Sequence, residues 1–164
     1  MSIADTLLPE FDQEMAATRR VLERVPSDKG EWRPHPKSFP LAHLAQLIAG
    51  MPGWFTMTIA QPELDLAKGS GYSVESTETL LAIFDRNVQE AHAAIATATD
   101  GVLAEPWSLK RSGTVLFTLP RAAVLRQHVS HLVHHRAQLG VYLRLLDVPV
   151  PSLYGPTADE PWQS

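Results

Sequence analysis

The chain has 164 residues, of which 45% are apolar and 20% are charged, and it contains no cysteine. These values are typical of one folded globular domain, and they exclude a disulfide framework, a thiolate metal site and a cysteine nucleophile. The formal net charge is −4 and the 14 basic residues are scattered, so the sequence shows no basic track for nucleic acid. Since it also shows neither a long apolar run nor a basic leader, we expect one soluble, cytoplasmic domain over residues 1–164 that binds no nucleic acid and no membrane.

The first predicted helix follows from a stripe of mainly apolar residues near the N-terminus. Its members recur every three or four positions, which places them on one face of a helix that packs against a partner. A proline-rich stretch that begins at Pro26 and includes Pro34 and Pro36 cannot continue this helix and predicts a loop. The stripe consists of Ile3, Leu7, Phe11, Met15, Thr18, Leu22 and Val25.

A second helix is predicted from Ser38, a residue that can cap a helix N-terminus, to about Ala60. Pro52 lies inside this segment between two nearby glycines, and it predicts a kink or a break. Residues 61–71 contain proline, aspartate and two glycines, and they predict a loop.

A third helix is predicted after Ser76, which can serve as its N-cap. Residues 106–120 then change in character, because two β-prone runs flank Arg111, Ser112 and Gly113 and predict a short hairpin. The apolar stripe of the third helix consists of Leu80, Phe84, Val88, Ala91 and Ile95.

The last predicted helix starts at Pro120 and ends before Pro149. Because the chain has four helical segments and no strong strand alternation between them, we predict an all-α fold. This is a four-helix bundle with at most a short hairpin before the last helix, and such bundles build metal sites in their core. The proline-rich tail from about residue 149 carries Tyr154 and Trp162, and we expect it to pack back on the bundle or on a neighbouring subunit.

Four of the seven histidines lie close together in the last predicted helix. A helix turns about 100° per residue, so His131 and His135 lie about 40° apart on one face and one turn apart in height. Two imidazoles placed in this way can share one metal ion. His128 lies on the same side of the helix, whereas His134 is rotated toward a flank. A polar seam inside the bundle or at a dimer interface is the alternative explanation of the pair.

A histidine pair needs a further ligand, because catalytic metal sites usually hold three protein ligands and keep one position open. The HExxH pattern would supply a glutamate base, but Leu132 occupies that place, which argues against a metalloprotease. His43 is the leading third candidate, since it lies one turn into the second predicted helix on its buried side. His128 is a possible substitute, and His92 and His35 rank lower. Acceptors for the ligands' outer nitrogens are sought among Glu14, Glu23, Asp85 and Glu90.

Two stretches of the chain resemble a known family. The segment SHLVHHRAQLGVYLRLLDVPVPSLYGPTADE looks like the C-terminal signature of the DinB-like (DinB/YfiT) proteins. The segment EWRPHPKSFPLAHLAQLIAG is similar to the family's tryptophan-and-proline loop and the helix that follows it. The resemblance implies an up-down-down-up four-helix bundle, often a homodimer, with a three-histidine site for nickel or zinc. Matched by position, the ligands are His43, His131 and His135. Ala137 stands where the family commonly has glycine, which leaves these ligands unchanged.

The resemblance also implies a reaction. Some relatives are thiol S-transferases or isomerases that use bacillithiol or mycothiol, with the metal holding the thiol as a thiolate. The leading interpretation is therefore a thiol-dependent S-transferase with a small-molecule substrate, in which Gln138 could orient the incoming group. One alternative is a metal-dependent hydrolase, which needs a carboxylate base that spacing does not identify. Another is a non-catalytic, stress-related protein whose ion is structural and has a fourth protein ligand. Three imidazoles suit nickel and zinc, and also copper and iron.

Overall fold

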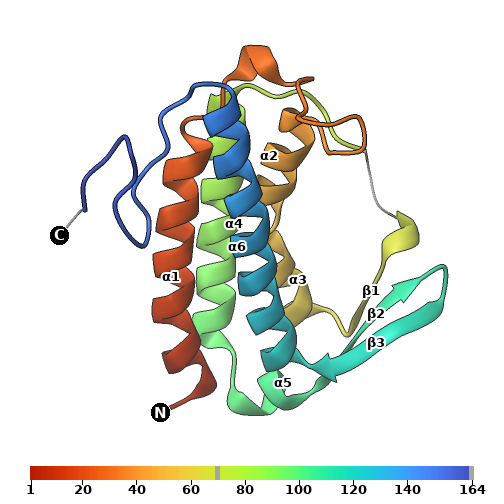
Figure 1. Cartoon of the computed structure of the whole chain (residues 1–164). Helices are drawn as coiled ribbons and strands as arrows, with labels where there is room; N and C mark the ends of the chain where they lie inside the picture. Colours follow the sequence, from red (N-terminus) through yellow and green to blue (C-terminus); the bar gives the residue numbers. More distant parts are fainter. Residues whose placement is uncertain (69–70, 163–164) are drawn as a thin grey trace.

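The computed structural model describes residues 1–68 and 71–162, and its main body is a bundle of long helical segments. In Figure 1, α1 and α6 run upward, whereas α2, α3 and α4 run downward. No helix in the described part of the chain is long and apolar enough to cross a membrane. The segments are α1 (Ile3–Leu22), α2 (Leu41–Gly50), α3 (Gly53–Ala60), α4 (Thr77–Thr97) and α6 (Arg121–Leu145).

The prediction of an all-α fold is wrong, because a three-stranded sheet lies beside the lower end of the bundle (Figure 1). Strand β1 pairs in parallel with β2, and β2 pairs antiparallel with β3. The hairpin formed by β2 and β3 confirms the predicted ribbon, and its turn places Ser112 and Gly113 at positive φ angles of 49° and 80°. The strands are β1 (Glu63–Asp65), β2 (Pro106–Arg111) and β3 (Thr114–Pro120).

Strand β1 and the 3₁₀ helix η2 (Leu66–Lys68) lie where the sequence predicts a loop. The reason is that β1 has only three residues, two of them acidic, so it shows no alternation of its own. Its strand conformation depends on pairing with β2, which follows much later in the chain. A further short helix that was not predicted, α5 (Asp100–Ala104), leads into β2.

The second predicted helix is interrupted at Pro52, as expected: α2 ends before it and α3 begins after it. The prediction that Ser38 caps α2 is wrong, since Pro40 occupies the N-cap position and no side chain caps the helix there. Instead, the amide of Leu41 donates to the carbonyl of Trp32 in the preceding loop at 2.9 Å. This contact satisfies a backbone donor that a capping side chain would otherwise bind.

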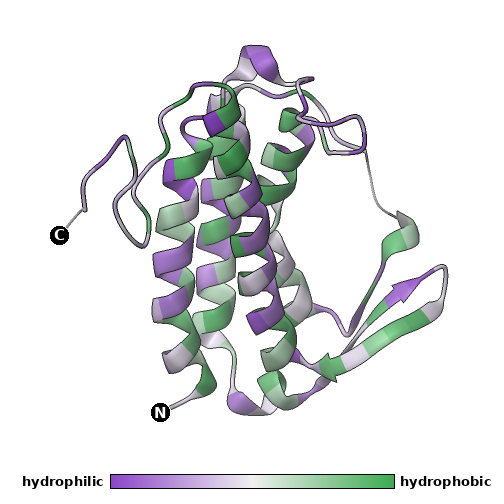
Figure 2. Cartoon of the chain, in the orientation of Figure 1, coloured by the Kyte–Doolittle hydropathy of each residue, from purple (hydrophilic) through white to green (hydrophobic). Residues whose placement is uncertain are grey.

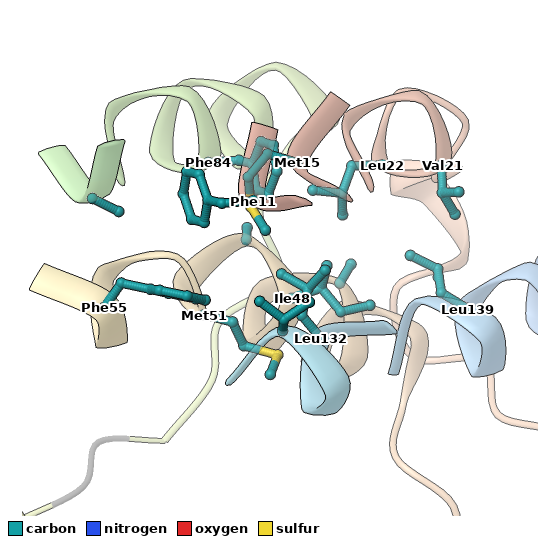
Figure 3. Packing of buried hydrophobic residues seen from close by; sticks show 14 of the residues in the cluster. Phe11, Met15, Val21, Leu22, Ile48, Met51, Phe55, Phe84, Leu132 and Leu139 are labelled. Atoms are coloured by element: carbon teal, nitrogen blue, oxygen red, sulfur yellow. The ribbon is translucent and has the colours of Figure 1, made fainter. Parts of the chain in front are cut away.

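The hydrophobic core lies between one layer formed by α1 and α4 and another formed by α2, α3 and α6 (Figure 3). The rings of Phe11 on α1 and Phe55 on α3 meet edge to face, with centroids 5.0 Å apart. Figure 2 shows both hydrophobic and hydrophilic residues on α1, as its stripe pattern predicts. Most members of the two predicted stripes on α1 and α4 are buried, which confirms that these faces point into the core.

The C-terminal tail packs back against α1, as predicted, and polar contacts hold it there. Arg20 contacts Glu160 at 2.7 Å, and Arg24 also binds the Glu160 carboxylate. The guanidinium of Arg24 donates to the carbonyl of Pro149 at 2.9 Å. Trp162 is 64% exposed, so this ring does not cover the end of the bundle.

One ion pair is buried within the bundle. Arg136 on α6 is only 2% exposed, and its guanidinium contacts the Glu14 carboxylate at 2.7 Å. The same guanidinium donates to the Glu14 carbonyl at 3.1 Å and to the Thr18 hydroxyl at 3.2 Å. The Tyr154 hydroxyl of the tail donates to Glu14 at 2.7 Å. These contacts join α1, α6 and the tail.

We expect Glu14→Ala to lower the free energy of unfolding by about 3–5 kcal/mol, because the buried charge of Arg136 would lose its partner. The matched control is Glu10→Ala, which removes an exposed pair with Arg126 and should cost about 0–1 kcal/mol. Urea unfolding of both variants measures the difference. Equal losses in the two variants would contradict this account of the buried pair.

Candidate metal centre

Helix α6 brings His131 and His135 side by side, as their spacing predicts. Their Nε2 atoms are 2.9 Å apart and their ring centroids are 4.7 Å apart. Two imidazole nitrogens that each bind one ion at about 2.0–2.1 Å lie about 3 Å apart when they occupy adjacent positions around it. At this spacing the two rings form a hydrogen bond with each other, and the same spacing also fits adjacent ligands of one shared divalent ion.

Gln138 holds the ring of His135 from its other side. Its Oε1 lies 2.8 Å from Nδ1 of His135, and its Nε2 lies 3.1 Å from Nε2 of His134. Because an amide oxygen only accepts hydrogen bonds, Nδ1 of His135 carries the proton and Nε2 presents its lone pair. This is the tautomer that a metal ligand needs.

From the sequence, Gln138 is expected only to orient an incoming group, and the outer acceptors are expected among carboxylates. The contact can be predicted from the sequence, because Gln138 follows His135 by three residues and both side chains therefore lie on one face of α6.

The electrostatic surroundings favour a neutral imidazole at His131. Partial burial lowers the pKa of His131, and the neighbouring rings of His135 and His134 lower it further. Metal ions bind the neutral form of histidine, so a lowered pKa keeps this ring available at neutral pH.

His128 is a core histidine. Its Nε2 lies 2.9 Å from the Thr58 hydroxyl, and its ring meets those of Trp54 and Phe55 edge to face. Burial lowers the pKa of His128 to about 4, with a smaller effect from His131. The ring is therefore neutral at physiological pH, and the Thr58 hydroxyl engages its Nε2.

His43 lies on α2, where the sequence places it, but its ring is held between two other aromatic rings. The Phe39 ring is 4.3 Å away, and the Tyr72 ring stacks on it at 4.6 Å with an angle of 7° between the planes. Phe39 also adjoins His135, with centroids 6.5 Å apart. Within residues 1–68 and 71–162, no three His, Cys, Asp or Glu side chains form a group that could hold a metal ion. The structure thus brings together His131 and His135, and the complete three-histidine set stays a prediction.

The other candidates lie apart from the pair. His92 contacts a carboxylate of α1 at 3.5 Å on the exposed surface, and His35 accepts a hydrogen bond within its own loop. Among the suggested outer acceptors, Glu23 and Asp85 bind an arginine of α1, and Glu14 binds the buried arginine of α6. The outer partner of His135 is an amide and not a carboxylate.

The fold and the site define a helical bundle with a small sheet and a facing histidine pair on its last helix. The model of the DinB family matches residues 1–163, and the chain belongs to this family. A DinB-like protein from Bacillus cereus is similar in structure, with a TM-score of 0.72, 18% identity and coverage of 92% of this chain and 97% of that one. A DinB-like protein from Bacillus subtilis gives a TM-score of 0.70, 18% identity and coverage of 89% and 96%. At this identity the likeness shows the shared fold. No curated protein matches the chain.

We expect Thr58→Val to lower the free energy of unfolding by about 1–3 kcal/mol, because buried His128 would lose its hydrogen bond. Thr97→Val is the matched control: this threonine is exposed on α4, and its replacement should change stability by no more than about 0.5 kcal/mol. Chemical denaturation tests both variants. A stable Thr58→Val variant would show that the hydroxyl is not needed by the histidine.

Proposed function

We propose that this chain binds one divalent transition ion, nickel or zinc, through His131 and His135, with His43 as the third ligand. The observation that carries the proposal is the pair of Nε2 atoms that face each other at 2.9 Å. Gln138 supports it, because its hydrogen bond directs the lone pair of His135 toward His131. Imidazole nitrogens are suitable ligands for both metals.

His43 completes the ligand set if its ring turns out of the stack between Phe39 and Tyr72. Helices α2 and α6 pack against each other, and the Phe39 ring adjoins the rings of both His43 and His135, which supports a rotation of the His43 side chain toward the pair. Three protein ligands leave a coordination position open to a small molecule. His131 is exposed, which keeps this side of the site accessible from solvent.

We further propose that the site serves thiol transfer. When bound, the ion supplies positive charge that lowers the pKa of a small thiol, so that the thiolate is present at neutral pH. The thiol comes from a cofactor, because the chain has no cysteine. Its sulfur forms a bond to an electrophilic carbon, the leaving group departs with the bonding electrons, and the thiol proton passes to solvent. The chain contributes the oriented histidines and the open access to them.

The two alternatives have less support. A hydrolase would need a carboxylate base, but Glu14, Glu23 and Asp85 are engaged with arginines and Glu90 is exposed on α4. A purely structural ion would need a fourth protein ligand, and the candidate His128 is instead packed against Trp54 and Phe55 and hydrogen-bonded to Thr58. The homodimer, the stress-related role and the cytoplasmic location stay predictions.

Elemental analysis by mass spectrometry tests the metal site. We expect about one nickel or zinc per chain after reconstitution, since one set of three ligands holds one ion. The double variant His131→Ala, His135→Ala should lose the metal and His43→Ala should bind it more weakly, whereas the exposed His92→Ala should retain it. Metal-free wild-type protein after reconstitution, or equal metal in the double variant, would overturn the proposal.

The role of Gln138 is tested by the affinity for the ion. Gln138→Ala should weaken metal binding by about 10–100-fold, because the ring of His135 would lose its orienting acceptor. Gln138→Glu keeps an acceptor oxygen at this place and should lose less. Competition with a coloured chelator gives the dissociation constants. If both variants bind the metal as wild type does, Gln138 does not orient His135.

A further inference from the structure

The sheet encloses an apolar pocket beside His131. The pocket has a volume of about 310 Å³ and lies between α3, α6 and one face of the sheet. Each strand contributes to its floor: Leu64 comes from β1, Leu109 from β2 and Phe117 from β3. The pocket therefore exists only because the connection after α3 forms a strand and joins the hairpin.

The register of the sheet explains why the floor is continuous. Leu64 is paired with Leu109, and Leu109 is paired with Phe117, so the three side chains form one row across the strands. Trp107 precedes Leu109 by two residues and lies on the same face of β2. Its ring centroid is 6.3 Å from that of Phe117.

The helices supply the opposite wall, and no Asp, Glu, Lys or Arg lines the pocket in the described part of the chain. Trp54 of α3 lies 5.5 Å from His131 and 5.7 Å from His128, measured between ring centroids. His128 in this wall is hydrogen-bonded to the Thr58 hydroxyl. A charged group would lose its hydration here without gaining an ionic partner, which is unfavourable.

We propose that this pocket binds the uncharged, apolar part of the small molecule that reacts at the histidine site. An apolar cavity of about 150 Å³ takes up one benzene molecule, so this pocket has room for about two fused rings or a branched hydrocarbon of that size. It lies at the lower end of the size range of ligand pockets. The assignment of this ligand as the substrate rests on the proposed function, whereas its binding does not.

A second hollow adjoins the apolar pocket at Trp54 and has a different lining. Its volume is about 410 Å³, and it is bordered by His43, Gln46, Asp65 and Tyr72. Trp54 and two leucines of the connection line both hollows. The hollow that includes His43 therefore has polar lining residues and the pocket that includes His131 has a mainly apolar lining, so an apolar group is directed to the pocket.

The test uses two matched probes, 2-naphthylmethanol and 2-naphthoate, which share a ring system and differ in charge. The four tryptophans report where a probe binds through their indole N–H signals in nitrogen-15 NMR spectra. We expect 2-naphthylmethanol to shift the signals of Trp54 and Trp107 and to leave those of Trp32 and Trp162 unchanged. In protein stripped of metal with a chelator, the carboxylate should bind at least about tenfold more weakly, because the pocket itself offers it no partner.

A charge at the rim provides a second test. Leu66 is 41% exposed, so Leu66→Glu should fold, and it should weaken binding of 2-naphthylmethanol at least about tenfold. Leu145→Glu places the same change on a leucine that is 56% exposed and lies outside the pocket, and it should bind the probe as wild type does. Unshifted Trp54 and Trp107 signals in the wild type, or equal affinity in the two variants, would overturn the inference.

Metal content is measured on the same samples, so that the two proposals can fail separately. Binding of the probe by protein that takes up no metal would support the pocket and overturn the metal site. Uptake of metal by protein that binds no probe would overturn the pocket alone.

Discussion

The ion pair between Arg136 and Glu14 fixes how α6 is rotated about its axis. Its carboxylate and guanidinium lie inside the bundle, and separating them would leave a charge buried without a partner. A helix turns about 100° per residue, so His135 lies about 100° from Arg136 and His131 about 140° from it. Buried Leu132 and Leu139 fill the arc between them. With the arginine held on α1, the histidine pair is directed to the opposite border of the buried face.

This rotation gives the molecule two different sides. On the side of α1, the tail is attached by arginine contacts to Glu160 and by the Tyr154 hydroxyl, and these contacts serve stability. On the side of α2, α3 and the sheet, the histidines meet aromatic rings and two hollows. Figure 1 shows the tail and the sheet on opposite sides of the bundle, so the tail leaves the histidine site uncovered.

Local patterns in the sequence predict the parts of the fold that local interactions determine. The stripes of α1 and α4, the break at Pro52 and the hairpin turn at Ser112 and Gly113 all depend on neighbours within a few positions. Strand β1 was not predicted and the N-cap of α2 was predicted wrongly, because each depends on a backbone partner outside its own segment.

The same distinction holds at the site. The proximity of His131 and His135 follows from helical spacing. The contact between Gln138 and His135 follows from the same spacing rule, although the role expected for Gln138 was to orient an incoming group. The stacking of His43 between Phe39 and Tyr72 brings in residues from two loops, whose paths periodicity does not encode.

The direction of the helices has a consequence for how relatives of this chain can diverge. Helix α3 ends in the lower part of the bundle and α4 begins at the upper end, so the connection between them must bridge these two levels (Figure 1). On its way it supplies Leu64 to the apolar pocket and Tyr72 to the polar hollow. The helices dictate how far this connection reaches, but they do not dictate which side chains it carries. Ligand preference can therefore change through substitutions in one surface segment while the helical frame and its folding stay the same.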